Sequence, residues 1–143
     1  MRRVIGLGNV FRGDDAAGLE IARRLQTECG RTDVIVHEGD MTDLLDLMDG
    51  CDDVVIFDAV TSGAPAGTIH LIDATTDALP TTMRFSTHAL GLQDTLELAR
   101  ITGRLPAKVE IVGIEAGDCG FGLKLTPEVA EAIDRLIEGA FHA

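Results

Sequence analysis

Three polar side chains, those of Asp15, Asp58 and His88, stand in predicted loops where they could act together on one substrate. Asp15 lies in the loop after the first apolar run of the sequence, and Asp58 directly follows the apolar residues 54–57. His88 lies in a polar loop just before a predicted helix. Two carboxylates and one imidazole suit a borderline divalent ion such as zinc or nickel, and they leave positions for water or substrate. The sequence has no H-E-x-x-H motif, so such a site would be assembled from three separate loops.

Each candidate also has a purely structural interpretation. Acidic residues in the first turn of a helix complement its dipole, so Asp14 and Asp15 both fit a capping role. We expect Asp14 to cap the helix and Asp15 to project into the site, and the reverse assignment stays open. Asp58 is equally compatible with a turn, because an aspartate readily accepts hydrogen bonds from the next backbone amides. A single histidine such as His88 more often has a structural role than a ligand role.

Short apolar runs alternate with amphipathic segments along the chain. Five runs are predicted as strands, namely residues 4–7, 34–36, 54–57, 68–72 and 109–114. Helices are predicted around 17–25, 44–48, 90–101 and after residue 126, where Thr126 is expected to be the N-cap and Pro127 the first helical residue. The pattern predicts one domain over residues 1–143. Its expected fold is a three-layer α/β/α sandwich of the phosphorylase/hydrolase-like kind, with a mostly parallel, twisted five-stranded sheet and helices on both faces.

The predicted sheet indicates where a ligand would bind. The run 54–57 is apolar at every position, as in a central strand buried on both faces. The run 68–72 follows a short Gly/Pro loop and is expected to be antiparallel. Ligands of such sheets bind beyond the carboxyl ends of the strands, where successive connections leave in opposite directions. A strand order beginning 2-1-3 would therefore place residues 8–15 and 58–67 on opposite walls of one crevice.

The charge of the chain argues against several classes of partner. Its 12 basic and 24 acidic residues give a net charge of −12, which disfavours nucleic acid and anionic membrane surfaces. No apolar stretch approaches the ~20 residues that span a bilayer. Cys29, Cys51 and Cys119 form no C-x-x-C motif and are odd in number, so neither a disulfide framework nor a thiolate zinc site is favoured. We therefore expect a cytoplasmic protein with reduced thiols.

Other chemistries have weaker support. The Gly-x-Gly at 6–8 follows a strand as in dinucleotide-binding domains, but the third glycine is missing and two carboxylates stand where a pyrophosphate would bind. Neither a P-loop nor a G-x-S-x-G nucleophile motif is present. Ser62 and Ser86 have no obvious base beyond His88, and Cys119 fits an inert thiol better than a nucleophile. A nucleotide-binding α/β domain stays as a less favoured alternative.

Several blocks of sequence occur around the candidate residues in a characteristic order. They are G-L-G-N at 6–9, G-D-D-x-x-G at 13–18, E-G at 38–39, V-I-F-D-A at 55–59, S-T-H-x-x-G-L at 86–92, G-I-E at 113–115 and L-T-P-E-V at 125–129. Together they span nearly the whole chain. The sequence resembles the hydrogenase maturation proteases, endopeptidases that trim the C-terminal tail from the large subunit of [NiFe] hydrogenase.

This resemblance implies that Asp15, Asp58 and His88 are the catalytic and metal-contacting residues. It implies that they sense nickel already inserted in the large-subunit precursor, that zinc or cadmium could occupy the site in vitro, and that a monomer acts on this precursor. A non-catalytic chaperone that docks the same precursor stays as an alternative. Three positions depart from the family pattern without removing an implied ligand: Ala16, Asp40 and Ala116.

Overall fold

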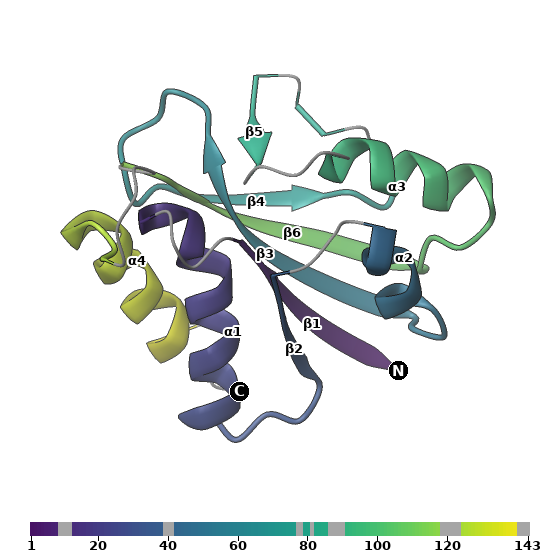
Figure 1. The fold of residues 1–143 in the computed structure, drawn as a ribbon, viewed down its shortest axis with the longest axis horizontal. Coiled ribbons are helices and arrows are strands. Elements are labelled where there is room, and N and C mark those ends of the chain that lie inside the picture. The colour runs from purple at the N-terminus through teal and green to yellow at the C-terminus, as the bar shows by residue number, and fades with distance from the viewer. Residues whose placement is uncertain are drawn as a thin grey trace.

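The computed structural model describes residues 1–8, 13–38, 42–76, 79–80, 82–85, 91–117 and 124–139. In these residues a sheet has the strand order β2-β1-β3-β6-β4, and β5 adds to it by pairing with β3 (Figure 1). The strands are β1 (Arg2–Leu7), β2 (Val34–His37), β3 (Asp53–Thr61), β4 (Ile69–Asp73), β5 (Arg84–Phe85) and β6 (Lys108–Glu115). β1, β2, β3 and β6 are parallel, whereas β4 and β5 are antiparallel to their neighbours. The five predicted strands, the 2-1-3 order and the antiparallel 68–72 segment are confirmed.

Helices cover both faces of the sheet, which confirms the predicted sandwich (Figure 1). They are the 3-10 turn η1 (Gly13–Ala16) and the α-helices α1 (Ala17–Thr27), α2 (Thr42–Met48), α3 (Leu92–Ile101) and α4 (Pro127–Glu138). Helices α1 and α4 share one apolar core with Val55 and Phe57, and α2 and α3 share the other with Ile56. Alternate residues of β3 thus enter opposite cores, which explains its unbroken apolar run. Within the described residues, no helix is both long enough and apolar enough for a membrane crossing.

In the described residues the sheet has six strands instead of the predicted five, because the short strand β5 was not predicted from the sequence. Phe85 pairs with Val60 and Arg84 pairs with Thr61, so β5 lies along the last residues of β3. β1 pairs with β3 only as far as Phe57, and β6 occupies the other side of Val60. β5 therefore takes the edge of β3 that β1 leaves open. This arrangement continues the sheet beyond the carboxyl end of β1.

Two glycines allow α1 to approach the sheet closely. A Cβ atom on Gly6 would overlap the carbonyl oxygen of Gly18, and one on Gly18 would overlap the carbonyl oxygens of Leu7 and Phe57. These contacts involve backbone atoms, which cannot move aside as a flexible side chain can. The start of α1 is therefore fixed against the carboxyl ends of β1 and β3. This contact positions η1, which directly precedes α1.

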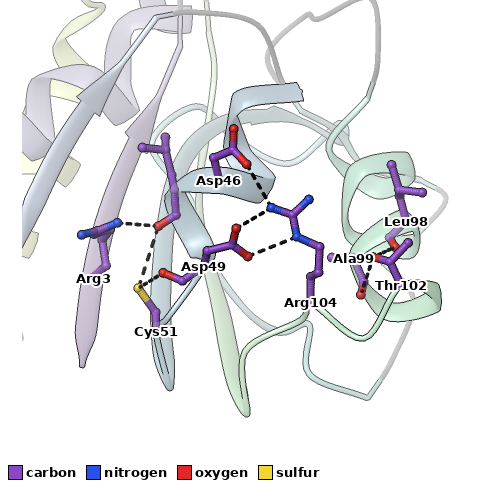
Figure 2. A network of polar contacts seen from close by, with 9 residues as sticks. Arg3, Asp46, Asp49, Cys51, Leu98, Ala99, Thr102 and Arg104 are labelled. Atoms are coloured by element: carbon purple, nitrogen blue, oxygen red, sulfur yellow. Dashed lines mark hydrogen bonds and ion pairs between the residues drawn. The ribbon is translucent and has the colours of Figure 1, made fainter.

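On the face of the sheet opposite to α1, a polar network joins α2 to the loop after α3 (Figure 2). The guanidinium of Arg104 donates to Asp46 over 3.0 Å and to both carboxylate oxygens of Asp49 over 3.1 and 2.5 Å. Arg3 of β1 donates to the carbonyl oxygen of Leu47 over 2.8 Å. These contacts fasten a helix of only seven residues that has little intrinsic stability.

Candidate functional site

Asp58 lies inside β3, near the carboxyl edge of the sheet. Its side chain is fully buried, and its Oδ1 atom accepts a hydrogen bond from the Ala59 amide over 2.9 Å. Because β3 continues to Thr61, the interpretation of Asp58 as a turn residue is wrong. The flanking Phe57 and Ala59 enter the core under α1 and α4, so the Asp58 side chain lies on the face covered by α2 and α3.

Asp15 reaches the same edge from η1, which contacts β3. Its exposed fraction is only 6 %, unusually low for a carboxylate. Gly18 lies three residues after Asp15 and packs against the carbonyl oxygen of Phe57, the residue before Asp58. The structure therefore brings the segments that carry Asp15 and Asp58 together at the junction of β1 and β3, as the 2-1-3 order predicted. The roles of the two carboxylates stay predictions.

Asp14 has a different role from the predicted one. Its Oδ1 accepts from the Thr126 amide over 2.7 Å, and its Oδ2 accepts from the Gly117 amide over 2.7 Å and from the Thr126 hydroxyl over 2.8 Å. The N-cap of α1 is Ala16, and α1 has no side-chain cap. The prediction that Asp14 caps its own helix is thus wrong, because its carboxylate ties η1 to the end of β6 and the start of α4.

Thr126 occupies the predicted N-cap position of α4, with Pro127 as the first helical residue. The predicted N-cap position of Thr126 is therefore confirmed. The capping hydrogen bond expected from its side chain to α4 is not formed. Its hydroxyl is instead used as a donor to Asp14. The helix start is therefore held by a carboxylate from a distant part of the chain.

Four predicted or discussed residues lie outside the described residues: His88, Asp40, Ser86 and Cys119. The described chain nevertheless reaches both sides of the segment with His88. β5 ends at Phe85, which pairs with Val60 two residues beyond Asp58, and α3 has its N-cap at Gly91.

A complete three-residue metal site is not seen in the part of the chain that the structure describes. The predicted set is Asp15, Asp58 and His88, of which only the two aspartates belong to that part. The set as a whole therefore stays a prediction. Buried carboxylates on neighbouring segments can bind a cation through their oxygens or can act as a base that takes a proton from water.

A second polar cluster, which no sequence pattern indicated, is formed by Ser62, His70 and Glu115. Glu115 ends β6 with an exposed fraction of 1 % and accepts hydrogen bonds from the Ser62 amide over 2.8 Å and the Ser62 hydroxyl over 2.6 Å. His70 Nε2 lies 3.1 Å from Glu115 Oε1. Burial raises the pKa of Glu115, but the hydrogen bonds from Ser62 and His70 outweigh it and hold the pKa below its usual value. Ser62 is thus bound to a carboxylate, which does not favour its role as a nucleophile.

Comparisons with known proteins agree with this architecture. A sequence model of the hydrogenase maturation protease family matches residues 20–143. The chain is 33 % identical over 145 residues to the hydrogenase 2 maturation protease of Escherichia coli K12, covering 98 % of this chain and 88 % of that protein. It is 30 % identical to the hydrogenase expression/formation protein HupD of Thiocapsa roseopersicina, covering 97 % of this chain and 65 % of that one.

Solved structures show the same likeness. The [NiFe] hydrogenase maturation protease HybD from Thermococcus kodakarensis superposes with a TM-score of 0.79 at 28 % identity, covering 96 % of this chain and 94 % of that one. The hydrogenase maturating endopeptidase HybD from E. coli gives a TM-score of 0.74 at 27 % identity, covering 96 % and 87 %. A mostly parallel sheet covered by helices on both faces is thus the framework that this chain shares with these maturation proteases. The chain belongs to the hydrogenase maturation proteases, which confirms the resemblance seen in its sequence.

Proposed function

We propose that this protein is the endopeptidase that removes the C-terminal extension from the large-subunit precursor of a [NiFe] hydrogenase after nickel insertion. Support comes from its family and from relatives whose names specify hydrogenase 2 and [NiFe] hydrogenase maturation. The observation that supports the proposal is that the segments carrying Asp15 and Asp58, two carboxylates more than nine-tenths buried, meet near the junction of β1 and β3. We further propose that it works as a monomer in the cytoplasm, where the free thiols of Cys29 and Cys51 stay reduced.

Nickel enters this proposal as part of the substrate. Asp15, Asp58 and His88 would contact the ion that the precursor already carries, and zinc or cadmium could replace it in vitro. Oxygen and nitrogen donors suit such borderline divalent ions. Two buried carboxylates add a negative potential that attracts a cation at short range. A precursor without the ion would lack this attraction, so cleavage would wait for nickel.

The chemical step requires a base as well as a recognition element. One of the two aspartates would take a proton from a water molecule. The oxygen of that water would attack the scissile carbonyl carbon in the same step. The same proton would then pass to the leaving amide nitrogen as the carbon–nitrogen bond breaks. General acid–base catalysis of this kind contributes about 10²- to 10⁴-fold to a rate.

The test is a processing assay with a purified precursor, in nickel-loaded and nickel-free forms, in which mass spectrometry follows the loss of the tail. Asp15→Asn, Asp58→Asn and His88→Ala should each lower the cleavage rate of the loaded precursor by about 10²-fold or more. Asp43→Asn, a change of the same type at an exposed position of α2, should leave the rate unchanged.

Three outcomes would contradict the proposal. Binding of the loaded precursor without any mass change would favour the chaperone alternative. Equal cleavage of loaded and nickel-free precursor would remove nickel as the recognition element. Processing at the parent rate by a correctly folded Asp58→Asn variant, checked by far-UV circular dichroism, would remove Asp58 from the site.

A further inference from the structure

Glu115 is a charged residue buried where a charge is expensive. Its side chain is 1 % exposed, and both carboxylate oxygens accept hydrogen bonds. Oε2 accepts from the Ser62 amide, while Oε1 accepts from the Ser62 hydroxyl and lies next to Nε2 of His70. An ionised carboxylate is tolerated in such a place when hydrogen bonds replace its lost hydration. The hydrogen bonds of the cluster thus replace the lost hydration of Glu115, and its three members come from the segment after β3, from β4 and from β6.

The register of the sheet places this cluster beside Asp58. Asp58 of β3 pairs with Gly113 of β6, and Gly113 pairs with His70 of β4. Glu115 is two residues beyond Gly113, so it lies on the same face of the sheet as Asp58 and His70. Adjacent strands are ~5 Å apart, which puts the backbones of Asp58 and His70 about 10 Å from each other.

The cluster also fixes the end of β3. Ser62 directly follows the last β3 residue, Thr61, and both its amide and its hydroxyl are held by Glu115. The backbone makes a second link here, because the Ala116 amide donates to the Val60 carbonyl over 2.8 Å. β5 in turn pairs with Val60 and Thr61. Without the Ser62 anchor, the last residues of β3 would lose a restraint only three to four residues beyond Asp58.

We propose that Glu115, acting through Ser62 and His70, is a positioning residue for peptide cleavage that holds the end of β3 and thereby fixes the Asp58 carboxylate. This inference rests on the proposed function of Asp58. Glu115 does not meet the substrate, because it is buried beneath the edge of the sheet. Its removal therefore lowers kcat while leaving KM nearly unchanged. A misplacement of about 1 Å in a catalytic group can cost roughly 10²-fold in rate.

A glutamine at this position makes the role measurable. The Glu115→Gln oxygen still accepts from the Ser62 amide, and its NH₂ group can donate to the Ser62 hydroxyl oxygen and to a neutral His70 ring nitrogen. A protonated His70 has two N–H donors, so its Nε2 then faces the glutamine NH₂ donor. The variant should thus work at mildly alkaline pH and fail at acidic pH, which a simple loss of core packing would not produce.

The experiment measures kcat and KM for processing of the nickel-loaded precursor at about pH 5.5 and about pH 8. Relative to the parent, Glu115→Gln should keep kcat within about threefold at the higher pH and lose about tenfold or more at the lower pH. Adding His70→Phe to this variant should abolish the difference between the two pH values. Glu115→Ala should lower kcat at both pH values.

Two outcomes would overturn the inference. In the first, Glu115→Gln has the kcat of the parent at both pH values and a folded Glu115→Ala also keeps the parent kcat. In the second, the substitutions change KM and leave kcat unaltered. Hydrogen exchange of the free protein gives an independent measurement. Glu115→Ala should speed exchange of the Ser62 and Thr61 amides about tenfold or more, and unchanged exchange contradicts the inference. A parent protein that cleaves nothing refutes the proposed function, whereas the exchange data still decide whether Glu115 holds β3.

Discussion

Replacing Asp14 with asparagine tests the conclusion that this residue is a structural anchor. The carboxylate of Asp14 is fully buried and accepts three hydrogen bonds from Gly117 and Thr126, more than 100 positions away along the chain. Asparagine has nearly the same shape but replaces one oxygen acceptor with an NH₂ donor. In the better of its two orientations, the amide oxygen keeps Gly117 and the Thr126 hydroxyl, while the NH₂ group faces the Thr126 amide. At least one buried backbone amide then loses its partner.

The expected loss of stability follows from these contacts. A buried donor without a partner costs about 1–3 kcal/mol, and a hydrogen bond to a charged group contributes about 1.5–3 kcal/mol. Because these terms overlap, we expect Asp14→Asn to lower the free energy of unfolding by about 2–4 kcal/mol. For a domain of this size, 1 kcal/mol corresponds to a Tm change of roughly 3 °C. The expected fall in Tm is therefore about 6–12 °C.

Thermal unfolding followed by circular dichroism measures this change, with urea unfolding as a second determination. Asp43→Asn is the matched control at an exposed position and should cost less than about 1 kcal/mol. Thr126→Val removes only the hydroxyl donor and should cost about 1 kcal/mol. A Tm for Asp14→Asn within about 2 °C of the parent, less than the effect of 1 kcal/mol, would refute the anchoring role.

Three further changes probe the fold. Gly18→Ala should cost about 3 kcal/mol or more in urea unfolding, because the new methyl group meets fixed carbonyl oxygens, whereas Gly91→Ala, with open surroundings, should cost less than about 1 kcal/mol. The hydrogen bond from Arg31 holds the pKa of Asp33 below its usual value against the opposing effect of burial, so its stabilisation is present at neutral pH and lost as the pH falls through the lowered pKa. Asp33→Asn should therefore lower Tm at neutral pH, and the difference from the parent should shrink as the pH falls through the lowered pKa, as thermal unfolding at a series of pH values would show. Arg104→Met should lower Tm only slightly, and the difference from the parent should shrink in high salt, since this arginine is partly exposed; a large, salt-independent fall in Tm would contradict a mainly electrostatic role.

Elements with a strong local pattern could be predicted from the sequence. The unbroken apolar run of β3 and the spacing of apolar residues on α1 and α4 depend on local burial, which periodicity reports directly. β5 has only two residues, too few for any period to show, and it exists because β1 leaves an edge of β3 unpaired. Helix α3 was expected from residue 90 but has its N-cap at Gly91 and begins at Leu92, a small shift of the kind that local patterns do not resolve.

The site was predictable only in part. Asp58 was singled out because a carboxylate beside an apolar run is conspicuous, and the strand order indicated that its segment lies near the segment of Asp15. The partners of Asp14 and Glu115 were not predictable, because they depend on contacts between residues far apart in the sequence. His70 looked like one residue of a strand, and only the register of β4 against β6 brings it to Glu115. The positions of two such residues in the sequence do not indicate that they will be in contact.

The geometry of η1 also bears on which of the two adjacent aspartates is available for catalysis. A 3-10 helix has three residues per turn, so the side chains of Asp14 and Asp15 leave its axis about 120° apart. Asp14 is directed at the end of β6 and the start of α4, where its oxygens already accept from Gly117 and Thr126. Asp15 must then point elsewhere, and η1 itself lies against β3. The two positions should therefore separate experimentally, with Asp14→Asn losing stability and Asp15→Asn losing cleavage at nearly unchanged Tm. If Asp15→Asn instead unfolds the protein and a folded Asp14→Asn abolishes cleavage, the assignment of the two residues is reversed.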